Sequence, residues 1–96
     1  LRAPMVGHLG DGNFHVLLPY NPEKKETYEK IRKFSDILIE KTLELEGTIT
    51  GEHGVGLHKK EYLKKEHADN LPTMKLIKRT MDPNNIMNPG KIFDLN

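Results

Sequence analysis

The dipeptide Asp11-Gly12 lies between two short segments, residues 3–9 and 13–19, in which apolar and β-forming residues recur. Because Asp and Gly adopt positive φ angles more readily than most residues, Asp-Gly at this place predicts a β-hairpin with a two-residue turn. Pro19 then ends the second strand, since proline cannot donate a ladder hydrogen bond. An antiparallel strand pair near the N-terminus is therefore the main constraint that the sequence puts on the fold.

The turn also predicts which residues of the two strands face each other. With Asp11 and Gly12 at its centre, His8 is directly opposite His15. Directly opposed residues of an antiparallel pair share one face, with Cβ atoms roughly 4.5–5.5 Å apart, so the two imidazoles can reach one metal ion. The alternative is a polar hairpin whose histidines only stack or hydrogen-bond across the strands, and the spacing is compatible with both.

Residues 23–46 predict one long helix. Ile31, Phe34 and Leu38 follow one another at steps of three or four residues, which is typical of an apolar stripe facing a core. Gly47 follows the last periodic residue, and glycine is the residue most often found in the left-handed conformation after a helix. We therefore expect the helix to be capped at Gly47.

Two shorter helices are expected in the second half of the chain. A charged helix covers residues 58–66, and a third, with Pro72 in its first turn, covers residues 72–81. Residues 88–91 read Asn-Pro-Gly-Lys and predict a turn. Two strands followed by helices predict an α+β fold with a ferredoxin-like antiparallel sheet, in which residues 1–96 form a single domain.

The loop at residues 51–56, which reads Gly-Glu-His-Gly-Val-Gly, carries further candidate site residues. Glu52 and His53 are neighbours that we expect to point in different directions, so that one can bind a metal while the other faces a substrate. The glycines let the backbone approach a flat ligand closely, and the alternative is an ordinary flexible loop. His58 and His67 lie among charged residues and are interpreted as surface residues.

The composition excludes several classes of function. Lys and Arg number 15 and Asp and Glu number 14, so a net charge of +1 gives no electrostatic case for nucleic acid or an anionic membrane as partner. The absence of cysteine excludes disulfide and thiolate–metal frameworks. No apolar run reaches the roughly 18 residues that a transmembrane helix needs.

Three stretches together resemble a known family: residues 7–15 (GHLGDGNFH), 47–59 (GTITGEHGVGLHK) and 82–93 (DPNNIMNPGKIF). They are similar to the C-terminal part of FAD-linked oxidases of the vanillyl-alcohol-oxidase type. Within these, they resemble the branch of D-lactate dehydrogenases, the glycolate oxidase FAD subunit and D-2-hydroxyglutarate dehydrogenases. The resemblance implies a C-terminal fragment that belongs to the cap domain of a larger enzyme, with the FAD-binding domain upstream of Leu1.

The resemblance also implies roles for individual residues. The ligands of a divalent metal, Zn, Mn or Fe, would be His8, His15 and Glu52. His53 would lie over the flavin and act on the substrate hydroxyl as general base. Asn88 and Lys91 would contact FAD, most of which the missing domain would bind.

The activity implied is the oxidation of a D-2-hydroxy acid, D-lactate or glycolate, to the 2-keto acid, with hydride transfer to flavin. The hydroxyglutarate branch has an Asn two residues after the second histidine of the first motif, where this chain has Leu17, which favours the D-lactate type. We expect the isolated fragment to be inactive and to associate through exposed apolar surface, with the missing domain or with further copies. The electron acceptor and the compartment (cytoplasmic, membrane-associated or mitochondrial) are left open.

Two other functions are compatible with the same residues. Two histidines, a glutamate and an adjacent histidine also suit a zinc hydrolase with water at the open position, although the helical H-E-x-x-H pattern is absent. A non-catalytic ferredoxin-like module that binds metal is the other alternative. Flavin bound to the intact protein would distinguish the oxidoreductase from both.

Overall fold

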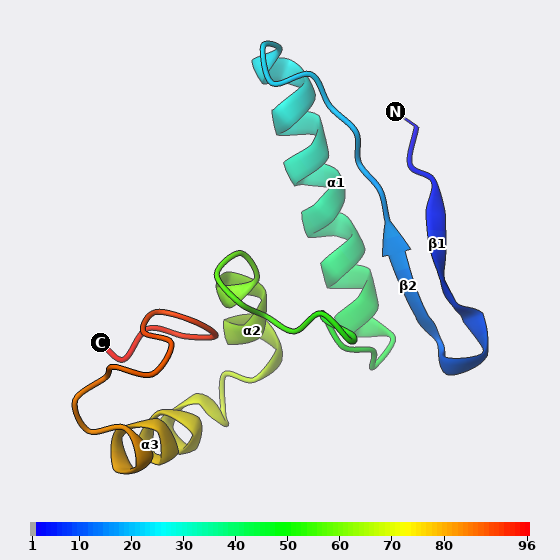
Figure 1. Cartoon of the computed structure of the whole chain (residues 1–96). Coiled ribbons are helices and arrows are strands. Elements are labelled where there is room, and N and C mark those ends of the chain that lie inside the picture. Colours follow the sequence, from blue (N-terminus) through cyan, green and yellow to red (C-terminus); the bar gives the residue numbers. More distant parts are fainter. Residues whose placement is uncertain (1) are drawn as a thin grey trace. The chain divides into compact units, whose positions relative to one another are not determined.

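The computed structural model describes residues 2–96, which divide into two compact units, residues 2–46 and 47–96. The first unit contains a strand pair and the longest helix, and the second contains two shorter helices (Figure 1). Strands and helices in separate stretches of sequence confirm the α+β fold class. The sheet of the described residues has two strands, and its ferredoxin-like extension stays a prediction.

The strands β1 (Met5–His8) and β2 (Asn13–Val16) are shorter than the predicted segments, and a connection of four residues joins them. A 3₁₀ turn, η1 (Leu9–Asp11), comes first, and Gly12 follows in the left-handed conformation with φ +70°. The prediction of a two-residue Asp-Gly turn is therefore wrong. That turn needs a positive φ at both residues, whereas here Gly12 alone of the two adopts one.

The four-residue connection changes the strand register. Val6 pairs with His15 and His8 pairs with Asn13, so the direct opposition predicted for the two histidines is wrong. Side chains alternate between faces along a strand, and His8, two residues after Val6, therefore shares its face with His15. The shared face is confirmed, with the histidines as diagonal neighbours whose backbones are roughly 7–8 Å apart.

Gly7 lies opposite Phe14 at a point where the two strands approach closely. A Cβ atom at Gly7 would be 2.4 Å from the carbonyl oxygen of Asn13 and 2.5 Å from the Cα atom of Phe14. Both are backbone atoms, which cannot rotate away as a side chain can. A larger residue at position 7 would therefore push the strands apart, and with them the two histidines.

The helix α1 (Lys25–Glu44) confirms the first predicted helix. Its predicted apolar stripe is half-buried at Ile31, Phe34 and Leu38, as a core-facing stripe should be. The periodicity of 3.6 residues was sufficient for this prediction because the stripe extends over most of the helix.

The end of α1 differs from the prediction. Glu46 takes the left-handed conformation, with φ +61°, and its N–H donates to the carbonyl oxygen of Leu43 at 3.0 Å. The capping position is thus one residue earlier than Gly47. A left-handed φ is less favourable for glutamate than for glycine, because its Cβ atom comes close to the backbone.

The second unit contains α2 (Lys60–Glu66) and α3 (Leu71–Met81), which confirm the two shorter helices. Pro72 lies in the first turn of α3, where a backbone N–H has no partner within the helix and its loss is tolerated. The apolar residues that are buried among those described, Ile49 and Leu63, are 6% and 4% exposed and both belong to this unit. The core is therefore small.

Both units expose large apolar side chains. Leu9 is 92% exposed in the first unit, and Met81 and Ile86 are 77% and 76% exposed in the second. The accessible surface is 7898 Å², whereas two separate compact units of half the mass would together expose about 6,800 Å². The chain is thus more open than two compact units, and its exposed large side chains confirm the predicted exposed apolar surface.

Among residues 2–96, none of the helices combines the length and the hydrophobicity that a bilayer crossing requires.

Candidate functional site

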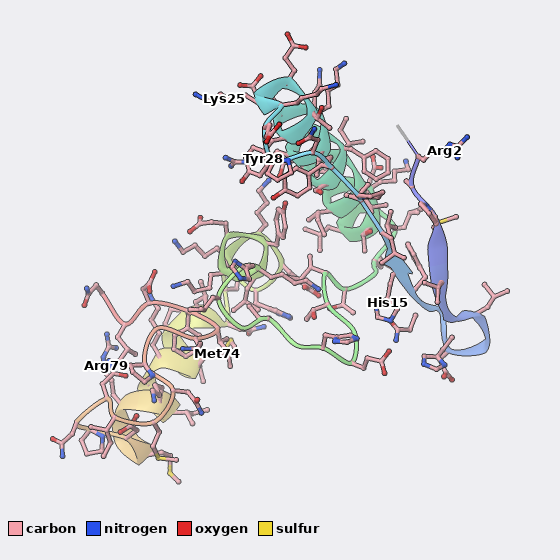
Figure 2. The ribbon with its side chains drawn as sticks, turned by 45° about the horizontal axis from the view of Figure 1, so that its top comes forward. Arg2, His15, Lys25, Tyr28, Met74 and Arg79 are labelled. Carbon is pink, nitrogen blue, oxygen red and sulfur yellow. The ribbon has the colours of Figure 1, made fainter. Side chains whose placement is uncertain are left out.

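The first set of predicted site residues lies on the hairpin. His8 is exposed at the end of β1, and His15 is half-buried on β2, from which its ring extends in Figure 2. Val6 and Asn13 occupy the same face, since each is paired with one of the two histidines. The hairpin thus presents two imidazoles from one face, as a pair of metal ligands would require.

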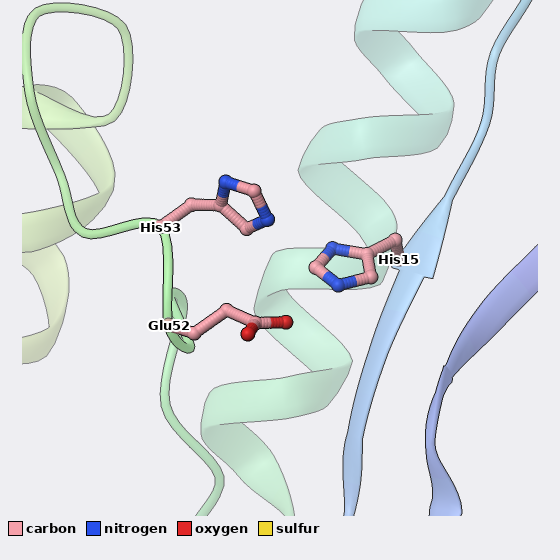
Figure 3. Close-up of side chains that lie close together, drawn as sticks. All are labelled: His15, Glu52 and His53. Carbon is pink, nitrogen blue, oxygen red and sulfur yellow. The ribbon is translucent and has the colours of Figure 1, made fainter.

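Glu52 and His53 lie on the loop of the second unit, and both are exposed. A carboxylate oxygen of Glu52 and a ring nitrogen of His53 are within 4.8 Å of each other. Figure 3 shows both side chains extending to the same side of the loop. The prediction that they point in different directions is therefore wrong, because the turn at Gly51–Gly54 brings two neighbouring side chains round to one side.

Side-chain hydrogen bonds define the course of this loop. The Glu66 carboxylate on α2 accepts the N–H of Ile49 at 3.2 Å, just before the loop begins. The Thr50 hydroxyl donates to the carbonyl oxygen of Gly54 at 2.7 Å, and closes the loop over Glu52 and His53. Gly54 has a φ of +73°, a conformation in which glycine is favoured. The loop is thus anchored at its start and closed across its tip.

The predicted turn at residues 88–91 is confirmed. The N–H of Lys91 donates to the carbonyl oxygen of Asn88 at 3.3 Å, and Gly90 has a φ of +72°. Proline at the second position and a positive φ at the third are the features of a type II turn. Asn88 and Lys91, the two predicted cofactor contacts, border one cavity of about 390 Å³ in the second unit.

The exit of this turn is bonded to the preceding parts of the second unit. The Lys60 ammonium at the start of α2 donates to the carbonyl oxygen of Gly90 at 3.0 Å and to the Asp94 carboxylate at 2.9 Å. The N–H of Ile92 donates to the carbonyl oxygen of Gly56 at 2.7 Å. The loop that carries His53 is therefore bonded to the residue that directly follows the turn at residues 88–91, although more than thirty residues separate the loop from the turn.

Asp82 supports the entry to the same turn, and the sequence had indicated it only as the end of α3. It is 6% exposed and accepts hydrogen bonds from the Lys78 ammonium and from the N–H groups of Ile86 and Met87. The hydrogen bond from Lys78 lowers the pKa of the Asp82 carboxyl, the two N–H groups add to this, and burial opposes it. A polar residue directly after a helix and before a proline was the one sequence signal for this role.

Comparison with known proteins places these features in a family. The family model of FAD linked oxidases, C-terminal domain, matches residues 1–92. The chain belongs to this family. Its membership confirms the resemblance drawn from the three motifs.

Several relatives are enzymes of known name. The chain is 44% identical over 94 residues to a mitochondrial D-lactate dehydrogenase (cytochrome) of Arabidopsis thaliana, and the aligned region covers 97% of the chain and 17% of the relative. It is 44% identical over 88 residues to glycolate oxidase subunit GlcD of Bacillus subtilis, covering 91% and 19%. It is 41% identical over 90 residues to a D-2-hydroxyglutarate dehydrogenase of Stutzerimonas stutzeri, covering 91% and 19%. The chain spans less than a fifth of the length of each of these relatives.

Proposed function

We propose that the chain is the C-terminal part of an FAD-dependent dehydrogenase that oxidises a D-2-hydroxy acid to the 2-keto acid. The family match over residues 1–92 carries this proposal. Relatives named for D-lactate, glycolate and D-2-hydroxyglutarate support the substrate class, because all three are 2-hydroxy acids. Leu17 favours D-lactate or glycolate over a dicarboxylate. In this proposal residues 1–96 complete a cap domain, and another part of the parent polypeptide binds most of the FAD.

The proposed metal ligands are two histidines of the hairpin and one carboxylate of the loop, namely His8, His15 and Glu52. Two neutral imidazoles and one carboxylate suit Zn, Mn or Fe and leave positions for a substrate. The shared face of the two histidines supports their part in this set. A divalent cation held by these residues would act as a Lewis acid and make the hydroxyl of a bound 2-hydroxy acid more acidic.

His53 is the proposed general base. A ring nitrogen of His53 takes the proton of the substrate hydroxyl, a step that suits an imidazole near neutral pH. A carboxylate oxygen of Glu52 lies within 4.8 Å of a ring nitrogen of His53, so the proposed base and the proposed metal ligand are neighbours. FAD, when bound, would supply the redox chemistry as the hydride acceptor.

Asn88 and Lys91 are the proposed cofactor contacts of this chain. They border a cavity of about 390 Å³, which is within the range of small-molecule sites but suits only a part of a molecule as large as FAD. An amide and an ammonium offer hydrogen bonds to the polar groups of a flavin nucleotide. We therefore assign this cavity a share of the cofactor and leave the remainder to the rest of the enzyme.

Anaerobic mixing of the full-length parent enzyme with candidate substrates tests the proposal. We expect bound flavin, visible by its absorbance, and its bleaching by D-lactate or glycolate, with slower bleaching by D-2-hydroxyglutarate. A parent protein without flavin would contradict the proposal and favour the zinc hydrolase or the non-catalytic module. Flavin that none of the three acids reduces would contradict the substrate class.

A further inference from the structure

Asp82 is the charged side chain that is buried in the described part of the chain, residues 2–96. It follows α3 directly and caps its C-terminus (orange in Figure 1). A buried carboxylate is unfavourable unless hydrogen bonds and a cation compensate for its lost hydration. The proposed reaction makes no use of Asp82, so its burial calls for another explanation.

The hydrogen bonds of Asp82 all serve the link between α3 and the turn at residues 88–91. Its Oδ1 atom accepts the N–H of Ile86 at 3.0 Å, and its Oδ2 atom accepts the N–H of Met87 at 2.9 Å. The Lys78 ammonium binds the same carboxylate and also the carbonyl oxygen of Met87. Asp82 and Lys78 thus fix the backbone of the residue that immediately precedes Asn88.

The backbone around this turn is strained. Asn85 and Asn88 have φ angles of +50° and +47°, and Ile92 has a φ of +70°. Asparagine tolerates the left-handed region better than most residues, but a β-branched isoleucine does not. Such conformations persist where the surroundings determine them, and they concentrate at ligand sites. Here the hydrogen bonds of Asp82 act at the entry of the turn, and those of Lys60 with Gly90 and of Ile92 with Gly56 act at its exit.

We propose that Asp82 is a positioning residue, which sets the turn at residues 88–91 so that Asn88 and Lys91 meet the flavin. This rests on the proposed function, in which that turn contacts the cofactor and His53 acts on the substrate. In this proposal Asp82 has no direct part in the reaction, since its carboxylate is bonded to Lys78, Ile86 and Met87. It acts through the N–H groups of Ile86 and Met87. Ile92, which directly follows the turn, is bonded to Gly56 in the loop of His53. A misplacement of about 1 Å in such a site can reduce a rate roughly 100-fold.

The test uses the full-length FAD-loaded parent enzyme with Asp82→Ala, Asp82→Asn and Lys78→Met. Asp69→Asn is the matched control, since it makes the same chemical change at an exposed residue of the same unit. We measure the absorbance spectrum of the bound flavin, the FAD content, the Tm and the rate constant of flavin reduction by substrate. We expect Asp82→Ala to lower the rate constant roughly 100-fold. Asp82→Asn, which keeps one acceptor oxygen, and Lys78→Met should show smaller losses, and Asp69→Asn should stay within about twofold of the parent enzyme.

A shifted flavin spectrum in the Asp82 variants, with FAD still bound, is the signature of a displaced turn. Variants that melt at a lower temperature, but keep the flavin spectrum and reduction rate of the parent enzyme, would overturn the proposal and leave Asp82 a purely structural residue. If Asp82→Ala does not fold, Asp82→Asn decides by the same measurements, because Lys78 itself lines the cavity assigned to the cofactor. If no 2-hydroxy acid reduces the flavin of the unaltered enzyme, the proposed function fails, whereas the spectra still show whether Asp82 positions the turn.

Discussion

The two units hold their candidate site residues by different means. In the first unit, backbone pairing between two strands places His8 and His15, and the close approach at Gly7 sets the distance between those strands. In the second unit, charged side chains bind the backbone of the loop and the turn, with Asp82 at the entry of the turn and Lys60 at its exit. The first unit should therefore respond mainly to changes of backbone and side-chain volume, and the second to changes of charge.

The largest effect is expected at His53, the proposed general base in the second unit. We predict that His53→Ala in the full-length enzyme lowers the rate constant of flavin reduction roughly 1,000-fold, because general-base catalysis contributes about 10²–10⁴-fold. Stopped-flow absorbance measures the rate, and elemental analysis measures the metal. His58→Ala, an exposed histidine of the same unit, is the control. A metal content that falls together with the rate would show that His53 is a ligand, as its distance from Glu52 also allows.

The hairpin should act through the metal instead. We predict that His8→Ala removes most of the bound metal and lowers turnover by at least about 10–100-fold. That factor is the usual cost of removing a residue that only hydrogen-bonds a metal ligand, and loss of a ligand itself should cost no less. Metal content and turnover should fall in proportion across a series of preparations. Full metal content in the His8→Ala enzyme would remove His8 from the ligand set, and added metal that restores activity would confirm the link between the two.

A change of volume in the first unit should disturb it without any change of charge. We predict that Gly7→Ala destabilises the hairpin by about 1–3 kcal/mol, the usual cost of overpacking, because the added methyl group meets the backbone of Asn13 and Phe14. Amide hydrogen exchange of peptides from residues 5–16 measures the local opening. Gly10→Ala is the control, since a Cβ atom there has no neighbour within 4 Å. Equal exchange in the two variants would show that the strands do not approach as closely as described.

The smallest effect is expected from acid, which should destabilise the second unit more than the first. The hydrogen bonds from Lys78 and Lys60 lower the pKa of Asp82 and Asp94, both in the second unit. In the unfolded chain these carboxyls take up protons at a higher pH, so their contribution to stability is present above about pH 4–5 and is lost as the pH falls through the lowered pKa. We expect hydrogen exchange, corrected for its intrinsic pH dependence, to accelerate below about pH 4 in the second unit, and Asp82→Asn to weaken this acceleration. An unchanged profile in Asp82→Asn would assign the acid sensitivity to other groups.

The sequence alone determined the helices, the turn at residues 88–91 and the family. The apolar stripe of α1 and the Asn-Pro-Gly-Lys turn act over a few neighbouring residues, so local preferences were sufficient for both. The candidate residues could be named because three motifs occur together in one order. The shared face of His8 and His15 was also predicted correctly, since a register shift of two residues keeps the alternation of side chains.

Tertiary structure decided the details that depend on how backbone segments meet. The register of the hairpin follows from a 3₁₀ turn whose length the Asp-Gly signal does not specify. The approach of Glu52 and His53 depends on the way their loop closes. The role of Asp82 depends on the chain turning back after α3, so that two N–H groups reach its carboxylate. Periodicity and residue preference describe a segment by itself, whereas these contacts arise only when one backbone segment is brought against another.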